Sequence, residues 1–497
     1  MNPQRQPSLY LNGQWIEGEG DFLQSTDPGK GDVLWQGHAA SAQQVDTAVH
    51  IARAAFPAWR DTPVATRAEH LQTFAAQIKS RQSELATLIS RENGKPLWDA
   101  QTEVTAMIGK IAISIDAWQQ RSGVHSKTTA QGELQLRHKP HGVVAVFGPF
   151  NFPAHLPNGH IVPALLAGNC VLFKPSELTP AVAQFTLQCW QSAGLPNGVM
   201  NLLQGSRETG AALVNHPQLD GLFFTGSAQT GHYLHQQWGG QPQKILALEM
   251  GGNNALIVEP VQDINAALFT VIFSAFVSSG QRCTCARRLL LPDSPWGDDF
   301  LQQLVQRSSE LTVAHGLSQP QPFMGALISS DAARHLQDGI RLLESLGGQL
   351  LLAPGFLNHQ QTLMTPVLID MSHANQTFDE ELFGPVLQVF RYRDRDHAIA
   401  QANATRFGLA AGLISDDSAA FDYGYRHLRA GIVNFNKPLT GASSEAPFGG
   451  IGASGNHRPS AYYAADYCAY PVATLRSDVP QCPPQMPPGM PACLMSK

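Results

Sequence analysis

The stretch I-L-A-L-E-M-G-G-N-N (residues 245–254) organises the chain together with S-S-G-Q-R-C-T-C-A-R-R (residues 278–288), which follows after an apolar interval of helical length. One carboxylate, Glu249, ends an apolar run, and one thiol, Cys283, lies in a turn rich in Gly and Ser. Covalent catalysis requires a nucleophile with a general base close to it. Here regular elements are expected to bring both side chains to loops. The stretch therefore predicts that Glu249 and Cys283 are chemical partners.

Short apolar runs alternate with helical patterns on both sides of this stretch. This alternation is typical of parallel sheets that are covered by helices on both faces. The predicted fold class is therefore α/β, with two parallel-sheet βα units. The runs of the first unit lie at 143–147, 170–173, 199–203, 221–224 and 245–248, and those of the second at 255–258, 289–291, 349–352, 386–390 and 431–436.

The N-terminal part precedes this rhythm and is largely helical. Residues 8–36 predict hairpin-like strands, after which Ser41 is a candidate helix cap. Thr66 and Glu69 form a capping-box pattern for a second helix, which we expect to end at the breaker cluster 93–96. A third helix is expected at 98–118.

Two further segments lie outside the βα units. Residues 132–139 alternate with period two, which predicts a strand with one polar face and a candidate oligomerisation element. Residues 480–491 are rich in proline and are expected to be extended or unordered.

Composition limits the class of protein. A chain of 497 residues is too long for one core, so we expect at least two domains. The net charge of −6 without a Lys/Arg cluster argues against a nucleic-acid or anionic-membrane surface. No apolar run reaches the ~18 residues of a membrane span, and the N-terminus lacks a signal core.

The seven cysteines are an odd, scattered set without a CxxC pair. This pattern fits a reducing cytoplasm rather than a disulfide framework, and it predicts no metal site. His155 and His160, the one pair that suggests a ligand set, are interpreted as loop histidines.

Three glycine or lysine motifs are candidates for dinucleotide binding. Gly450-Ile-Gly-Ala-Ser-Gly455 matches G-x-G-x-x-G but lacks the strand before it and the helix after it. Gly226-Ser227-Ala-Gln-Thr-Gly231 is better placed, between an apolar run and a helix, although a plain strand-turn-helix joint is equally consistent. Lys174-Pro-Ser-Glu177 follows a predicted strand, where a carboxylate favours NAD over NADP.

The remaining site candidates come from single residues. Asn151 follows another strand end, and its amide is a suitable oxyanion donor. Arg282 beside Cys283 is expected to favour the thiolate, and Cys285 is the rival nucleophile. Because Glu249 follows a buried strand, we expect its pKa to be raised, as suits a general base.

Seven motifs occur in an order that resembles the NAD(P)-dependent aldehyde dehydrogenase superfamily over residues 8–475. The resemblance implies a cofactor domain (1–120 and 141–254), a catalytic domain (255–465), an oligomerisation arm (121–140 and 466–479) and a proline-rich tail (480–497). The motifs are G-P-F-N-F-P (148–153), K-P-S-E (174–177), F-T-G-S (224–227), L-E-M-G-G-N (248–253), G-Q-R-C (280–283), E-E-L-F-G-P (380–385) and P-F-G-G (447–450).

By this resemblance Cys283 is the nucleophile, Glu249 the general base and Asn151 the oxyanion-hole amide. The expected cofactor is NAD, and no metal is expected. The implied cofactor contacts are Lys174, Glu177, Gly226, Ser227, Gly231, Glu381 and Phe383.

The segment 436–467 departs from the common family pattern at Gly452 and at 456–458. With L-P-N-G-H (156–160), it is similar to members that oxidise N-succinylglutamate 5-semialdehyde in bacterial arginine breakdown. A substrate with two carboxylates predicts cations and polar donors in the pocket. The candidates are Arg282, Ser443, Ser444 and Arg458.

The implied protein is a cytoplasmic homodimer or homotetramer that acts on a small aldehyde. Three alternatives stay open: another acidic semialdehyde as substrate, an acylating enzyme that uses coenzyme A, and a catalytically silent NAD-binding protein.

Overall fold

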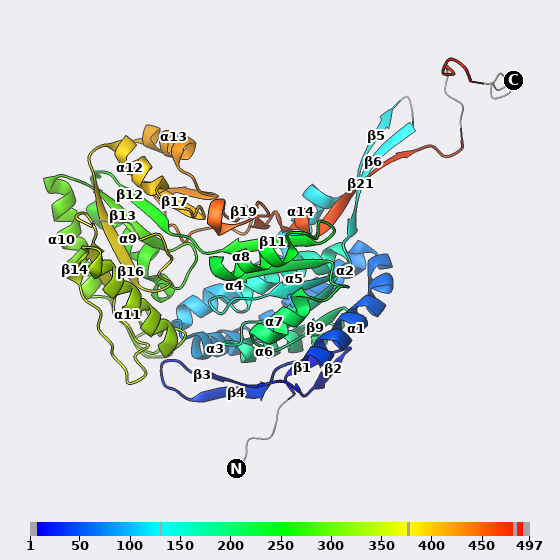
Figure 1. Ribbon diagram of the computed structural model, residues 1–497, viewed down its shortest axis with the longest axis horizontal. Helices are drawn as coiled ribbons and strands as arrows, with labels where there is room; N and C mark the ends of the chain where they lie inside the picture. Colours follow the sequence, from blue (N-terminus) through cyan, green and yellow to red (C-terminus); the bar gives the residue numbers. More distant parts are fainter. Residues whose placement is uncertain (1–6, 130–131, 375–377, 481–484, 491–497) are drawn as a thin grey trace, which may run out of the picture.

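Two seven-stranded sheets lie side by side in the body of the protein, and a three-stranded sheet projects from it as an arm (Figure 1). The computed structural model describes residues 7–129, 132–374, 378–480 and 485–490. The expected α/β class with parallel-sheet units is confirmed.

The first sheet has the strand order β11-β10-β7-β8-β9-β1-β2. Its central strands are apolar at almost every position and run parallel, while β1 and β2 add an antiparallel edge. The strands are β1 (Leu9–Leu11), β2 (Gln14–Ile16), β7 (Val143–Phe147), β8 (Cys170–Lys174), β9 (Met200–Leu202), β10 (Gly221–Gly226) and β11 (Ile245–Met250). The helices of this part are α1 (Ala42–Asp61), α2 (Val64–Ser80), α3 (Gln82–Asn93), α4 (Leu97–Ala117), α5 (His155–Ala167), α6 (Pro180–Ser192), α7 (Arg207–Val214) and α8 (Ala228–Trp238).

The N-terminal helices match the sequence prediction in part. Ser41 caps α1 in a full capping box with Gln44. The predicted capping box of Thr66 and Glu69 is wrong, because α2 begins at Val64 after Pro63, whose fixed φ suits a helix start. The single helix expected there is divided at Arg81 into α2 and α3.

The second sheet has the strand order β14-β15-β16-β13-β12-β17-β18, parallel except for β14. The sequence prediction missed β15 and β17. The strands are β12 (Asn254–Val258), β13 (Ala286–Pro292), β14 (Gln349–Leu352), β15 (Val367–Asp370), β16 (Val386–Tyr392), β17 (Ala410–Ile414) and β18 (Ile432–Phe435). The helices are α9 (Ile264–Phe276), α10 (Pro295–Ser309), α11 (Ser330–Ser345), α12 (Arg395–Asn403) and α13 (Ser418–His427).

The link between the sheets positions the site. Only residues 251–253 separate β11 of the first sheet from β12 of the second. Glu249 therefore lies at the carboxyl end of a strand in one sheet, while the turn that carries Cys283 precedes β13 in the other.

The arm contains β5 (His125–Thr129), β6 (Gly132–Pro140) and β21 (Ala469–Arg476), with β6 in the centre and all pairs antiparallel. This confirms the strand predicted at 132–139. Four large apolar side chains of the arm are exposed: Leu134, Leu136, Tyr470 and Leu475.

The predicted tail lies partly outside the described residues. Residues 480 and 485–490 are described, and they form neither helix nor strand. In the part of the chain that the structure covers, none of the helices combines the length and the apolar character that crossing a membrane would need.

Candidate active site

A cavity of about 1690 Å³ opens where the two sheets meet. Cys283, Glu249 and Asn151 come from three separate segments, and all three line it. A typical pocket for one small molecule has roughly 300–1,000 Å³. The cavity therefore has room for two ligands at once.

Glu249 is a buried carboxylate near the end of β11. Its Oε1 accepts a hydrogen bond from the backbone N–H of Ser460 at 3.0 Å, and its buried Oε2 has no partner among the described residues. Burial raises the pKa of Glu249 well above its usual value, as expected from the sequence. A buried carboxyl group with a raised pKa is a stronger base than an exposed one, as general base catalysis requires.

A turn in left-handed backbone conformation leads from α9 to Cys283. Ser278, Ser279 and Gly280 have φ values of +54°, +55° and +69°, which are unfavourable for the two serines. Two hydrogen bonds hold the turn: Ser278 Oγ donates to Asp99 Oδ2 at 2.5 Å, and Ser279 Oγ donates to the Gly325 carbonyl at 2.8 Å. The strain is therefore compensated by fixed partners.

Glycine is required at position 280. Besides the positive φ, a Cβ there would lie 2.1 Å from the carbonyl oxygen of Gly384. Beyond this turn, Cys283 lines the cavity. Cys285 is fully buried with its Sγ 3.9 Å from the Val277 carbonyl, so the two cysteines face different surroundings.

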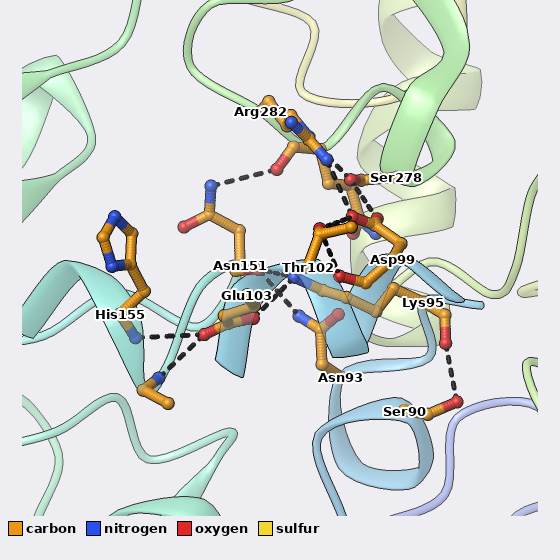
Figure 2. Close-up of polar contacts among 12 residues, drawn as sticks. Ser90, Asn93, Lys95, Asp99, Thr102, Glu103, Asn151, His155, Ser278 and Arg282 are labelled. Carbon is orange, nitrogen blue, oxygen red and sulfur yellow. Dashed lines mark hydrogen bonds and ion pairs between the residues drawn. The ribbon is translucent and has the colours of Figure 1, made fainter. Parts of the chain in front are cut away.

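The expectation that Arg282 favours a thiolate at Cys283 is wrong. The Arg282 guanidinium is paired with Asp99 at 2.7 Å and also donates to Ser278 (Figure 2). Burial, with Glu381 and Glu249 nearby, raises the pKa of Cys283, and Arg287 is the cation that lowers it. Without ligands the cysteine is therefore a thiol, because the adjacent arginine serves the turn rather than the sulfur.

Asn151 is held rigidly. Its Nδ2 donates to the Gln281 carbonyl at 3.0 Å, which leaves a second N–H for another acceptor. Its backbone carbonyl accepts from Lys95 Nζ at 2.7 Å (Figure 2). The amide is thus tied to the segment that carries Cys283.

A buried ion pair supports this arrangement. Lys95 and Glu103 lie 2.8 Å apart, both essentially without exposure. Glu103 Oε1 also accepts from the backbone N–H groups of Ala154 and His155, at 2.9 and 3.1 Å (Figure 2). Sequence reasoning missed these residues, since Lys95 lies in a breaker cluster and Glu103 lies inside a helix without a recognisable motif.

Four of the predicted cofactor residues lie together on the first sheet. Lys174, Glu177, Gly226 and Ser227 line the cavity, and Ser227 caps the N-terminus of α8 through the Thr230 N–H at 3.2 Å. The Lys174 ammonium lies 3.8 Å from Glu177. Gly231 is outside the lining, and a Cβ there would lie 2.2 Å from Met250 Sδ, so this glycine permits close packing of α8.

Glu381 and Phe383 line the same cavity from the segment between β15 and β16 of the second sheet. Glu381 Oε1 is buried at 3.5 Å from Arg287 and makes no hydrogen bond of normal geometry among the described residues. Burial raises the pKa of Glu381 to about 7. A buried carboxylate oxygen that has an ion-pair partner but accepts no hydrogen bond fits a hydroxyl donor from a bound ligand.

The predicted substrate residues divide into two groups. Arg282, Ser443 and Ser444 line the cavity, but the Arg282 guanidinium already has its carboxylate partner. The structure places Arg458 outside the lining, on the exposed side of its loop. The glycines of the 450–455 motif are also outside the lining.

The interpretation of His155 and His160 as loop histidines is wrong, because both belong to α5. His160 is buried between the Tyr467 hydroxyl at 2.7 Å and Thr225 Oγ1 at 3.0 Å. A separate group, Asp46, His50 and His216, brings its possible ligand atoms within 4.8 Å of one another, away from the cavity lining.

Comparison with known proteins supports one family. The model of the aldehyde dehydrogenase family matches residues 15–471. The N-succinylglutamate 5-semialdehyde dehydrogenase of Ectopseudomonas mendocina (strain ymp) is 59% identical over 481 residues, which are 97% of this chain and 99% of that protein.

Solved structures agree with this assignment. Methylmalonate-semialdehyde dehydrogenase from Oceanimonas doudoroffii superposes with a TM-score of 0.90 at 26% identity, covering 96% of this chain and 99% of that one. 1-Pyrroline-5-carboxylate dehydrogenase from Thermus with bound NAD gives 0.89 at 29% identity, covering 95% and 93%. This chain belongs to the aldehyde dehydrogenase family.

Proposed function

We propose that the protein oxidises N-succinylglutamate 5-semialdehyde to N-succinylglutamate, reducing NAD through a cysteine thioester. One observation carries the proposal: Cys283, Glu249 and Asn151 meet in a cavity with room for two ligands. The name of the Ectopseudomonas relative supports the choice of substrate. The sequence of the segment 436–467, which resembles that of enzymes for the same semialdehyde, is consistent with this choice.

The first step forms a bond between Cys283 Sγ and the aldehyde carbon. The thiol proton passes to solvent as this bond forms, and the Glu249 carboxylate is left for the later step. The second N–H of the Asn151 amide stabilises the oxygen that becomes negative. When bound, NAD would supply the hydride acceptor for this carbon, so that Cys283 would carry the acyl group as a thioester.

The second step breaks the thioester. Glu249 takes a proton from water, whose oxygen bonds to the acyl carbon as the bond from that carbon to Cys283 Sγ breaks. The carboxylic acid leaves, and the proton on Glu249 returns to the sulfur. Dividing the reaction in this way replaces one high barrier with two lower ones.

The residues around the cavity fit a dinucleotide. The helix N-terminus at Ser227 offers backbone N–H groups to a phosphate. Glu177, near the strand end at Lys174, offers a carboxylate to ribose hydroxyls. Glu381 does the same through Oε1, which accepts no hydrogen bond among the described residues. We propose that residues 1–120 and 141–254 hold the cofactor and that residues 255–465 carry the nucleophile.

Replacing Glu177 by Gln should weaken NAD binding about tenfold and NADP binding much less. The reason is that the carboxylate accepts hydrogen bonds from the 2′-OH of NAD but repels a 2′-phosphate. Fluorescence titration of both cofactors measures the two affinities. Glu344→Gln, an exposed change on α11, is the matched control. Equal losses for both cofactors would refute the ribose role.

The function itself is tested with a panel of aldehydes and NAD, with and without coenzyme A. We expect NADH from N-succinylglutamate 5-semialdehyde at the highest kcat/KM and no dependence on coenzyme A. A coenzyme A requirement would indicate an acylating enzyme, and no NADH from any aldehyde would indicate a silent NAD-binding protein. A preference for another acidic semialdehyde would correct the substrate.

We also propose that the arm joins copies of the chain into a homo-oligomer in the cytoplasm. Its exposed leucines Leu134, Leu136 and Leu475 would be covered by a second copy, and β5 lies at an edge of the three-stranded sheet. A monomer mass in light scattering would contradict the proposal.

A further inference from the structure

Lys110 is a buried lysine in the cavity wall. Its residue exposure is 1%, it lines the cavity, and its Nζ has no hydrogen-bond partner among the described residues. Its neighbours in α4 include the buried Met107 and Ile111. Because an unpaired buried amine is costly to folding, a lysine here calls for a partner that the protein itself does not supply.

The helix face that carries Lys110 belongs to the cavity. Thr102, Ala106 and Lys110 recur at intervals of four in α4, and all three line it. Helix α5, which packs against α4, contributes His155 to the cavity lining. The Nδ1 of His155 is also buried without a hydrogen-bond partner among the described residues. Two polar side chains with free hydrogen-bonding capacity thus converge from neighbouring helices.

The charges around Lys110 leave the position open for an anion. Glu103, the carboxylate of α4 on the same side, is fully engaged by Lys95 and by two backbone N–H groups. Burial raises the pKa of the neighbouring Cys468 thiol well above its usual value, so this group is uncharged, and burial lowers the pKa of Lys110 to about 7. Burial, Lys110 and Lys95 lower the pKa of His155 to about 3, so its imidazole is neutral.

We propose that Lys110 binds a carboxylate of the substrate, with the neutral His155 imidazole as a second hydrogen-bonding group. The inference rests on the proposed function and names a specificity residue for it. Unlike Arg282, whose guanidinium is held by Asp99, Lys110 has no competing carboxylate in the described part of the chain. A substrate carboxylate that enters the cavity would form an ion pair with the buried Lys110 ammonium and so offset the loss of its hydration.

Lys110→Met tests the proposal because it keeps the length of the side chain and removes the charge. For N-succinylglutamate 5-semialdehyde we expect kcat/KM to fall about 30-fold or more, mainly through KM, as for loss of a charge-assisted hydrogen bond. For a neutral aldehyde such as propanal we expect a change of less than about threefold. Lys110→Arg should recover part of the activity toward the acidic aldehyde.

Binding without turnover gives a second readout. N-succinylglutamate should raise the melting temperature of the wild-type chain, and it should not raise that of Lys110→Met. Succinate tested in the same way shows whether a short dicarboxylate occupies the same position. Ser114→Ala is the control: Ser114 is buried one turn further along α4, outside the cavity lining, and should not alter the selectivity.

The outcomes separate this inference from the proposed function. If the wild type oxidises the acidic aldehyde and Lys110→Met does so with similar KM, the role of Lys110 is overturned while the function stands. If the wild type does not oxidise it, the proposed function fails, and the melting experiment decides on Lys110. Equal stabilisation of both proteins by N-succinylglutamate, or of neither, would overturn the carboxylate site.

Discussion

Cys283→Ala should abolish NADH formation from every aldehyde that the wild type oxidises. The change removes the sulfur that bonds to the substrate carbon, and loss of a covalent nucleophile lowers kcat on the order of 10⁵-fold or more. Cofactor affinity should stay within about threefold, because the variant leaves the residues proposed to hold NAD in place. Steady-state absorbance at the NADH band and cofactor titration measure the two effects.

Cys285→Ala is the matched control for this prediction. Cys285 is two residues away, fully buried, and outside the cavity lining, so its loss should leave most of the activity. Activity that survives Cys283→Ala but is lost in Cys285→Ala would reverse the assignment of the nucleophile.

Glu249→Gln should produce a rapid burst of about one equivalent of NADH per active site and then stall. The amide cannot take a proton from water, so the thioester accumulates after hydride has left. A general base contributes typically 10²–10⁴-fold, which sets the expected fall in steady-state rate. Stopped-flow absorbance resolves the burst from the slow phase.

Hydroxylamine provides the control for this variant. As a strong nucleophile it attacks a thioester without help from a base, so it should restore repeated turnover in Glu249→Gln. Normal steady-state turnover in the variant without hydroxylamine would remove Glu249 from the mechanism.

Much of the fold was predictable because its strands are short, apolar and regularly spaced between helices. The runs at β7, β8, β10 and β11 show this pattern clearly. The failure at α2 has a local cause: the pattern of Thr66 and Glu69 resembles a cap, but the helix begins after Pro63, three positions before Thr66. Propensity alone did not distinguish the two.

The site was predictable only where the type of a residue and its local sequence indicate its chemical role. The expected rise in the pKa of Glu249 follows from its place after a buried strand, and the structure agrees. The partner of Arg282 was not predictable, because Asp99 lies 183 positions away in the sequence. The Arg282 charge holds the strained turn at Ser278 and does not activate the neighbouring Cys283 thiol.

The buried lysines show the same limit. Lys95 and Lys110 are both buried. Lys95 forms an ion pair with Glu103, whereas Lys110 Nζ has no hydrogen-bond partner among the described residues. The available signal was the position of Lys110 on the apolar face that also carries Met107 and Ile111. That signal indicates burial, whereas the missing partner is visible only in three dimensions.

The most direct test of the account is the mass of the intermediate on the protein. Glu249→Gln is mixed with NAD and N-succinylglutamate 5-semialdehyde, quenched in acid after the burst, and examined by intact and peptide mass spectrometry. We predict a gain equal to one N-succinylglutamyl group, located on the peptide that contains Cys283 and removed by hydroxylamine. A burst of NADH with an unmodified Cys283, or an acyl group on Cys285, would contradict it.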